Sequence, residues 1–244
     1  MTMEHKSEST ITPPPRNDVS SMFDRIAHRY DLLNRSLSFG QDVLWRKRMK
    51  RHLPDRADLK LLDLATGTAD QLIFLSSDPR IASGLGMDLA EKMLDIGREK
   101  IKKRNLASRF ELKTGDAIHI PVDDASCDVV TISFGIRNVL DVEQGLREMF
   151  RVLKPGGRAL ILEFSLPGNA VMRKLYLFYF RHILPRIGGL VSGDAYAYRY
   201  LNKTVETFPY GEAFCALMRT AGFENVRANP LTFGIASIYQ GDKR

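Results

Sequence analysis

Residues 60–70 of the chain, KLLDLATGTAD, constrain the fold more strongly than any other segment. An apolar run bounded by turn residues is typical of a buried strand, so we predict the first strand of a parallel sheet at residues 61–65. Gly67 follows between two threonines, where a glycine lets the backbone turn sharply and come close to a ligand. The apolar helical pattern that comes next would point free N–H groups and a positive dipole end at that ligand. We therefore predict a cofactor loop, the alternative being a purely structural turn.

A second predicted strand, Ile81–Asp88, ends in an acid that lies 21 residues after Gly67. Doubly wound folds place an acid at this spacing against the hydroxyls of a ribose, because a carboxylate can accept two hydrogen bonds at once. The alternative for Asp88 is a solvated helix N-cap, since an amphipathic helical pattern follows it directly. The loop lacks the third glycine of the dinucleotide fingerprint, so a nucleoside without phosphates fits the sequence better than a dinucleotide.

The chain continues with three more strand patterns. We predict strands at residues 110–112, Cys127–Ser133 and residues 158–164, and an amphipathic helix at residues 141–153 that the turn KPGG ends. This alternation predicts a doubly wound sheet, in which ligands bind at the carboxyl ends of the strands. Asp116, between Gly115 and Ala117, is placed to accept a hydrogen bond from the exocyclic amine of a base. Its alternative is an ordinary turn aspartate.

The composition is that of a globular protein. A length of 244 residues with 44% hydrophobic and 27% charged residues suits one large α/β domain. The formal net charge of +7 favours an anionic partner, either nucleic acid or a phospholipid surface, because charge alone does not choose between them. Cys127 and Cys215 lie in apolar segments without metal-ligand spacing. We therefore expect buried free thiols in a reducing compartment, and neither a disulfide nor a metal site.

The two ends of the chain differ in character. Residues 1–17 are polar and rich in proline, and we expect a disordered tail there before a single domain at residues 18–244. They lack the apolar core of a signal peptide, and the longest aromatic-aliphatic run, at residues 175–180, is far shorter than the roughly 20 residues of a membrane span. We therefore expect a cytoplasmic protein without a span. Near the other end we predict a helix at residues 211–222 and the last two strands at Val226 and at residues 231–239.

Two helical segments lie outside the predicted sheet. Residues 19–52 repeat apolar residues every three or four positions, and we expect this segment to cover a substrate cleft. It ends in a basic cluster at residues 46–51 beside Trp45, which is either a solvated face or a contact with an anion or a membrane surface. Residues 165–209 form an insertion whose core, VMRKLYLFYFRHILPRIGGLV, is too apolar on all sides for an ordinary surface helix. We predict a helical lid there.

The order of these features resembles that of the class I S-adenosylmethionine-dependent methyltransferases over residues 60–164. A closer resemblance, to the quinone-biosynthesis C-methyltransferases, is carried by MFDRIAHRYDLLNRSLSFGQDVLWR at 22–46, ISFGIRNV at 132–139, FRVLKPGGRALILEFSLP at 150–167 and YRYLNKTVETFP at 198–209. It spans nearly all of residues 18–240. It implies a Rossmann-like fold with a seven-stranded, mostly parallel sheet and helices on both faces. It also implies methyl transfer to a ring carbon of a polyprenylated quinol.

The resemblance further implies which residues contact S-adenosylmethionine and its product S-adenosylhomocysteine. The family's contacts fall on Thr68, Asp88, Asp116, Ala117 and Ser133, and the glycine turn itself adds Gly67, where we expect the backbone to approach the cofactor most closely. The chain departs from the family at Ala69, where glycine is usual, and at Thr66, where glycine is frequent. Because a methyl group is small, we expect the loop to form with Ala69 and the affinity for the cofactor to be the property affected.

For the reaction itself the resemblance implies Arg137 and Asn138 after the fourth strand, with Tyr30 of the N-terminal segment as a third contact. A quinol ring becomes strongly nucleophilic at carbon when a hydroxyl loses its proton, so the reduced ring is the expected substrate. A guanidinium stays protonated at any useful pH, and we therefore expect Arg137 to stabilise the phenolate or to orient a water. The sequence reveals no base, since His28 and His119 are lone histidines that we expect to be structural or on the surface.

The expected substrate is demethylmenaquinol, and the benzoquinol intermediate of ubiquinone biosynthesis is the alternative within the family. Residues 165–209 would line a channel for the prenyl tail and touch the inner face of the cell membrane, with Tyr198, Tyr200 and Asn202 in the substrate wall. We expect no nucleic-acid partner, and a homodimer is compatible with the sequence.

Two alternatives come from other classes of protein. An RNA-binding protein on a methyltransferase-like scaffold would explain the positive charge, but the aromatic-basic interleaving of an RNA-reading module is absent. The other alternative is an inactive scaffold of a quinone-pathway complex. The retention of Asp88, Asp116 and Arg137 argues against such a scaffold.

Overall fold

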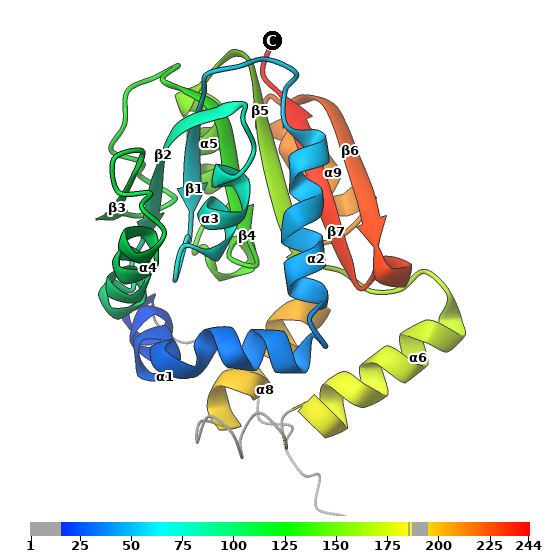
Figure 1. The fold of residues 1–244 in the computed structure, drawn as a ribbon. Coiled ribbons are helices and arrows are strands. Elements are labelled where there is room, and N and C mark those ends of the chain that lie inside the picture. The colour runs from blue at the N-terminus through cyan, green and yellow to red at the C-terminus, as the bar shows by residue number, and fades with distance from the viewer. Residues whose placement is uncertain (1–15, 185, 187–194) are drawn as a thin grey trace, which may run out of the picture.

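The computed structural model describes residues 16–184, 186 and 195–244, and its centre is a seven-stranded sheet with the order β3-β2-β1-β4-β5-β7-β6 (Figure 1). Strands β1 to β5 pair in parallel, whereas β7 is antiparallel to both of its neighbours. The strands are β1 (Leu59–Leu64), β2 (Ile81–Asp88), β3 (Phe110–Thr114), β4 (Cys127–Ser133), β5 (Leu153–Phe164), β6 (Glu224–Leu231) and β7 (Ala236–Asp242). The predicted Rossmann-like fold with a mostly parallel sheet is confirmed.

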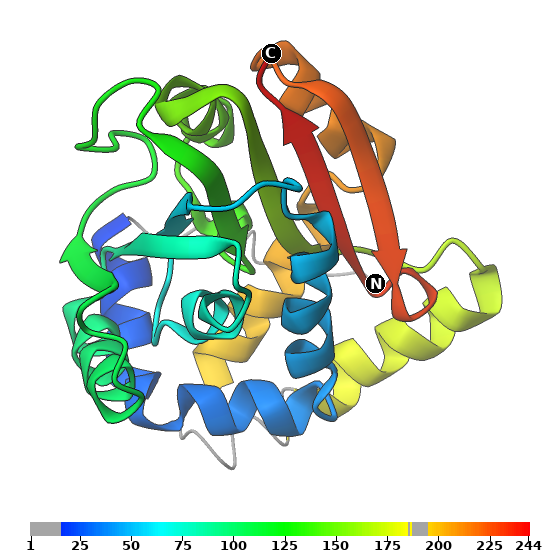
Figure 2. The same cartoon turned by 45° about the horizontal axis from the view of Figure 1, so that its top comes forward.

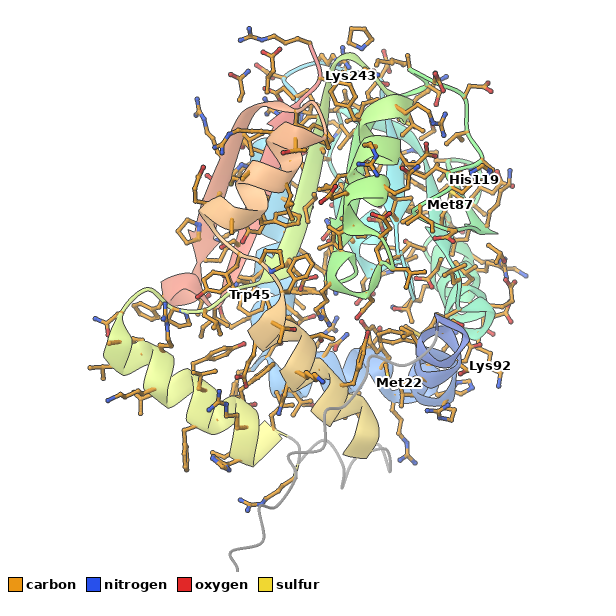
Figure 3. All side chains as sticks on the ribbon, turned by 180° about the vertical axis from the view of Figure 1, so that it is seen from behind. Met22, Trp45, Met87, Lys92, His119 and Lys243 are labelled. Carbon is orange, nitrogen blue, oxygen red and sulfur yellow. The ribbon has the colours of Figure 1, made fainter. Side chains whose placement is uncertain are left out.

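Helices cover both faces of the sheet. On one face lie α2 (Gln41–Arg48), α3 (Asp70–Ser76) and α4 (Glu91–Lys103), which are in front in Figure 1. On the other face lie α5 (Val142–Val152) and α9 (Glu212–Thr220), which are in front in Figure 3. Neighbouring residues of β1 therefore enter different cores: Leu61 packs with residues of α3, and Leu62 with residues of α5 and α9. Burial on both faces explains why the parallel strands occur in the sequence as continuous apolar runs.

The N-terminal helical segment consists of two helices that meet at a corner. α1 (Arg16–Leu37) runs beneath the carboxyl edge of the sheet, and α2 rises from its end along one face (Figure 2). The corner contains Phe39 and Gly40, whose φ angles of 52° and 73° are left-handed. A 3-10 turn, η1 (Met49–His52), then leads to β1. The helical pattern predicted over residues 19–52 is therefore interrupted, because a left-handed backbone cannot continue a right-handed helix.

The insertion after β5 is helical, as predicted. It contains α6 (Ala170–Phe178), a π-helical turn η3 (Tyr179–Ile183) and α8 (Ala195–Thr207). Tyr176, Phe180 and Leu184 are buried in one cluster with Leu33 of α1 and Val205 of α8. The insertion and α1 thus pack together beside the strand ends, where a doubly wound sheet binds ligands.

Several strand boundaries differ from the predictions. β5 begins at Leu153, because this residue already pairs with Cys127 of β4, so the KPGG turn lies inside the paired segment. The expected strand at residues 231–239 is divided by the 3-10 turn η4 (Thr232–Gly234), which separates β6 from β7. β1 and β3 also differ from their predicted ranges by one or two residues at their ends. These boundaries are set by pairing with a neighbouring strand, and a local sequence pattern does not show which residues will pair.

The sequence also led to expectations for the start of the chain and for the two cysteines. The expected tail falls mostly on residues 1–15, which lie outside the described residues, whereas residues 16 and 17 belong to α1. Cys127 and Cys215 are buried and free, as predicted. Within the described parts of the chain, no helix is both long and apolar enough to cross a membrane.

Candidate functional site

Three adjoining hollows lie at the carboxyl edge of the sheet, beneath which α1 runs. The β2 cleft is bordered by the ends of β2 and β4 and by the turn after β3. The turn pocket is bordered by the turn after β1. The apolar cavity, of about 280 Å³, lies among α1, α2, α6, η3 and α8. Tyr30 of α1 borders all three hollows, so ligands in the cleft and in the cavity would meet at this side chain.

The turn after β1 has the tight backbone that the sequence predicted. Ala65, Gly67 and Ala69 have φ angles of 45°, 53° and 63°. The N–H of Ala69 donates to the carbonyl of Thr66 at 2.9 Å. Ala69 thus adopts the left-handed conformation that a glycine would adopt without steric cost, and the loop forms as we expected.

Asp88 links the end of β2 to this turn. One carboxylate oxygen accepts the N–H of Gly67 at 2.8 Å, and the other accepts the N–H of Ala90 at 2.9 Å. Burial raises the pKa of Asp88, and the backbone N–H groups oppose this rise. A carboxylate offers about four lone-pair sites, so Asp88 keeps capacity to accept a hydrogen bond from a ligand in the cleft. The N-cap of α4 is Ala90, so Asp88 lies before the helix and the N-cap alternative is wrong.

The predicted cofactor residues divide between two hollows. The β2 cleft is lined by Gly67, Asp88, Asp116, Ala117 and Ser133. Thr68 instead lines the turn pocket, where its hydroxyl donates to Asp31 at 2.6 Å and accepts from Lys100 at 2.9 Å. Asp116 lies in the predicted turn, and its carboxylate accepts the N–H of Ile118 at 3.2 Å.

Arg137 and Asn138, which we expect to act on the substrate, border different hollows. Arg137 lines the apolar cavity together with Tyr30, whereas Asn138 lines the β2 cleft. Asn138 accepts the hydroxyl of Tyr200 at 3.2 Å, and Tyr200 also lines the cavity. Asn202 lies outside the wall and donates to a backbone carbonyl at 2.7 Å, and the side chain of Tyr198 lies outside the described residues.

A buried carboxylate holds Arg137 in place. Its Nη1 donates to Glu163 at 2.8 Å and to the carbonyl of Phe134 at 2.6 Å, and the two charged side chains are 7% and 1% exposed. Burial raises the pKa of Glu163, and the charge of Arg137 opposes the rise. Among the described residues, the buried Nε of Arg137 has no hydrogen-bond partner. The guanidinium therefore keeps an N–H that a ligand in the cavity would satisfy.

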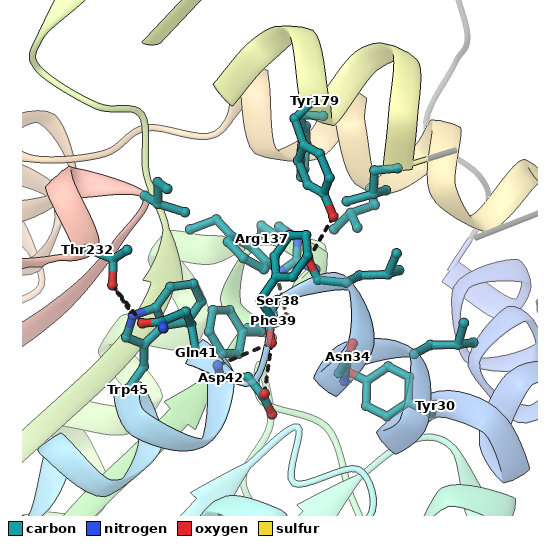
Figure 4. Close-up of a pocket in the computed structure, with 18 of the residues that line it drawn as sticks. Tyr30, Asn34, Ser38, Phe39, Gln41, Asp42, Trp45, Arg137, Tyr179 and Thr232 are labelled. Carbon is teal, nitrogen blue, oxygen red and sulfur yellow. Dashed lines mark hydrogen bonds between the residues drawn. The ribbon is translucent and has the colours of Figure 1, made fainter. Parts of the chain in front are cut away.

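Most of the cavity wall is aromatic or aliphatic (Figure 4). Tyr176 of α6 belongs to this wall, and its buried hydroxyl also lacks a partner in the described part of the chain. Burial raises the pKa of Tyr176 above its usual value, so the phenol remains a hydrogen-bond donor. Asp42 is the one carboxylate among the described residues of the wall. It is buried and accepts the hydroxyl of Ser38 at 2.8 Å (Figure 4).

The sequence patterns did not single out Asp63, although it lines the turn pocket. Its carboxylate is 1% exposed and accepts the hydroxyls of Thr66 at 2.6 Å and Thr131 at 2.5 Å. Burial raises the pKa of Asp63 from its ordinary value of 3.8 to about 6, while the two hydroxyls oppose the rise. An acid inside an apolar strand is the sign that could have drawn attention to this position.

Arg46 was placed with the basic cluster and is in fact buried, whereas its neighbours Lys47 and Arg48 are exposed. It lines both the turn pocket and the apolar cavity. No local pattern distinguished Arg46 from its exposed basic neighbours. His28 and His119 are exposed, as expected, and Figure 3 shows His119 away from the strand ends that form the site.

The strand order, the tight turn after β1 and the acid at the end of β2 define a Rossmann-like methyltransferase fold. A solved structure of an S-adenosylmethionine-dependent methyltransferase from Thermotoga maritima agrees with this class. It has a TM-score of 0.66 and 19% sequence identity, with 92% of this chain and 99% of that chain covered.

The sequence comparisons identify the family. The model of the ubiE/COQ5 methyltransferase family matches residues 11–243. The demethylmenaquinone methyltransferase of Thermus thermophilus is 47% identical over 222 residues, which are 91% of this chain and 100% of the relative. The ubiquinone/menaquinone biosynthesis C-methyltransferase UbiE of Geotalea daltonii is 44% identical over 226 residues, 92% of this chain and 96% of the relative. The chain belongs to the ubiE/COQ5 methyltransferase family.

The raised pKa of Asp63 makes stability depend on pH. A carboxyl whose pKa is about 6 in the folded state and near 3.8 when unfolded stabilises the fold fully below pH 4, and this contribution is lost as the pH rises through 6. At about 1.4 kcal/mol per unit, the loss is about 3 kcal/mol. We therefore expect the free energy of unfolding of Asp63→Asn, measured relative to wild type in urea, to increase by about 3 kcal/mol from pH 4 to pH 7.5. A difference that stays constant with pH would contradict the assignment.

Proposed function

We propose that this chain transfers a methyl group from S-adenosylmethionine to a ring carbon of a polyprenylated quinol, with demethylmenaquinol as the substrate. The observation that carries the proposal is the shared border of the two larger hollows. Tyr30 and Phe134 line both the β2 cleft and the apolar cavity, so a nucleoside and an apolar ring would meet there. The relative from Thermus thermophilus, named for demethylmenaquinone, favours the naphthoquinol. The benzoquinol of ubiquinone synthesis is the alternative, which the name of the Geotalea relative includes.

The residues of the β2 cleft fit S-adenosylmethionine. The carboxylate of Asp88 keeps hydrogen-bonding capacity for a ribose hydroxyl, and Asp116 with Ala117 would border the base. A side chain at Gly67 would place its Cβ 3.3 Å from the terminal methyl of Met93, so glycine keeps this border of the cleft open. When bound, the cofactor supplies an electrophilic methyl group on a sulfonium. Ser133 lines both the cleft and the turn pocket, so it would border the part of the cofactor that lies between them.

In the apolar cavity, Arg137 and Tyr176 supply donors for an oxygen of the quinol. Both are buried in a largely apolar wall, and the Nε and the hydroxyl have no partner among the described protein atoms, so a ligand oxygen could accept from them. Hydrogen bonds from a guanidinium are stronger to a phenolate than to a neutral hydroxyl, particularly away from water. These donors therefore favour the ionised ring, whose carbon is the nucleophile. Glu163 holds the guanidinium at the cavity and lies outside its wall.

Asp42 accepts the proton of the quinol hydroxyl in this proposal. It is the one carboxylate among the described residues of the cavity wall, and Ser38 occupies only part of its hydrogen-bonding capacity. After the methyl group has joined the ring carbon, that carbon loses its hydrogen as a proton and the ring becomes aromatic again. The proton from the ring carbon leaves to solvent, Asp42 returns its proton to the ring oxygen and is again a carboxylate, and one proton is released overall.

Helix α6 is the element that we expect to contact the membrane and the prenyl tail. Three apolar side chains on this helix, Val171, Leu175 and Phe178, are each more than half exposed. Residues 164–193 contain no acid, and the basic residues of this stretch are Arg173, Lys174, Arg181 and Arg186. An exposed apolar stripe with basic neighbours suits the surface of an anionic bilayer. We infer that α6 rests on the inner face of the cell membrane and that the tail enters the apolar cavity from there.

The experiment that tests the function is methyl transfer from labelled S-adenosylmethionine to chemically reduced demethylmenaquinone. We expect transfer to the naphthoquinol, much less to the reduced polyprenyl benzoquinone, and none to the two oxidised rings, which cannot form a phenolate. Equal or greater transfer to the benzoquinol would support the alternative substrate. No transfer to either quinol, by protein that binds S-adenosylhomocysteine, would contradict the proposal.

Arg137 must be tested together with its partner, because removing one member of a buried ion pair leaves an uncompensated charge that costs about 3–5 kcal/mol. We expect the double variant Arg137→Gln with Glu163→Gln to fold and to lower turnover about 100- to 1000-fold, the usual effect of losing a donor to a developing oxyanion. Its affinity for S-adenosylhomocysteine, measured by calorimetry, should change less than twofold. Glu163→Gln alone is the comparison: it loses stability because the buried guanidinium loses its counterion, so it is assayed at a temperature where it is folded. It should keep more turnover than the double variant because it retains the guanidinium. Similar turnover in the two variants would remove Arg137 from this role.

Asp42→Asn tests the proposed base. General-base catalysis contributes about 100- to 10,000-fold, so turnover at pH 7 should fall within this range. A phenolic hydroxyl ionises on its own near pH 10, and the rate of the variant relative to wild type should therefore rise about tenfold per pH unit between pH 7 and pH 9. The ratio of turnover numbers at saturating substrate is the measurement. A ratio that does not change with pH would indicate that Asp42 only shapes the cavity.

A further inference from the structure

Arg46 is a buried cation for which the described protein provides no counterion at salt-bridge distance. Its side chain is 6% exposed, its guanidinium carbon lies 5.2 Å from the centre of the Phe134 ring, and its buried Nε has no hydrogen-bond partner among the described residues. Burying a charge without a partner costs several kcal/mol. An unpartnered and charged donor in a pocket wall points to an anionic ligand group.

Three carboxylates line the turn pocket, those of Asp31, Asp63 and Asp70, and each has partners within the protein. Asp63 accepts two threonine hydroxyls, at 2.6 Å and 2.5 Å. Lys100 forms ion pairs with Asp31 at 2.6 Å and with Asp70 at 2.5 Å. Arg46 is the one basic residue among the described residues that line this pocket, so it is the group there that would attract an anionic part of a ligand, while the three carboxylates would attract a cationic part.

The turn pocket adjoins the β2 cleft. Tyr30, Ala65, Gly67 and Ser133 line both hollows. A ligand whose ribose lies at Asp88 would therefore extend past Gly67 into the turn pocket. The part of S-adenosylmethionine beyond its ribose and sulfur is an amino acid, which carries one carboxylate and one ammonium group.

We propose that Arg46 binds the α-carboxylate of the amino-acid end of the cofactor, with its Nε as a donor. This inference rests on the proposed function, because it takes S-adenosylmethionine as the ligand of the β2 cleft. Charge-assisted hydrogen bonds between a guanidinium and a carboxylate are among the strong ones in proteins. The engaged carboxylates of the pocket leave lone pairs for the ammonium group, so both charges of the amino acid are matched.

The test compares two ligands that differ in the amino acid alone. S-adenosylhomocysteine carries it, whereas 5′-methylthioadenosine has the same nucleoside and thioether and lacks it. Arg46→Met removes the charge and keeps an apolar chain against Phe134. We expect its affinity for S-adenosylhomocysteine, measured by isothermal titration calorimetry, to fall ten- to a hundredfold, and its affinity for 5′-methylthioadenosine to stay within twofold of wild type.

Two control variants distinguish the loss of a contact with the cofactor from a disturbed fold of the turn. Arg48→Met, on the exposed side of the same helix, should bind both ligands like wild type, and Arg46→Lys should recover part of the lost affinity for S-adenosylhomocysteine. An equal loss for both ligands in Arg46→Met would show that Arg46 supports the fold of the turn, and an unchanged affinity for S-adenosylhomocysteine would show that it is not a contact. Either result overturns the inference while the proposed function stands. A wild-type protein that binds neither ligand would overturn both.

Discussion

The hydrogen bond from the Gly67 N–H to the carboxylate of Asp88 joins the ends of two strands into one surface. β1 and β2 are parallel neighbours, so both end at the same edge and the turn after β1 reaches the acid that ends β2. The strand order reverses between β1 and β4, which opens a crevice at this edge in doubly wound sheets. α1 lies under the crevice and is tied to α4 by the bond from the Lys92 N–H to Asp24 at 3.0 Å. The cleft, the turn pocket and the cavity all exist because these elements converge there.

Charged groups buried in apolar surroundings give this site its chemical character. In a medium of low polarity an unsatisfied donor or a carboxylate interacts strongly with whatever enters, because little water competes with it. Arg137, Arg46 and Asp42 are such groups, and each has at most part of its hydrogen-bonding capacity satisfied by described protein atoms. They reduce the stability of the protein without ligands, as functional sites commonly do. The pair of Arg137 with Glu163 shows how the fold limits this cost while keeping an N–H for the cavity.

The sheet and the helices added to it have different roles. A solved methyltransferase with only 19% identity shares the fold, so the sheet alone does not specify a substrate. The apolar cavity is built mainly by α1, α2, α6, η3 and α8, which lie outside the alternating core of strands and helices. Among the described residues of its wall, Phe134, Arg137 and Phe164 come from the ends of β4 and β5, and Thr232 and Ile235 from the turn between β6 and β7. The selection of an apolar ring with a tail therefore depends on the N-terminal helices and on the insertion after β5.

The sequence alone determined the parts of the molecule that depend on local pattern. It located β2 and β4 residue for residue, the tight turn at Gly67, and the acids at positions 88 and 116, because apolar runs, glycine conformations and the spacing of one βαβ unit are encoded in short segments. Tertiary structure decided the rest. It buried Arg46 among exposed basic neighbours, put Asp42 in the cavity wall, and separated Arg137 from the adjacent Asn138 into two hollows. Each of these outcomes depends on packing between distant segments, as in the bond from Trp45 to Thr232 across 187 positions, and no local pattern contains that information.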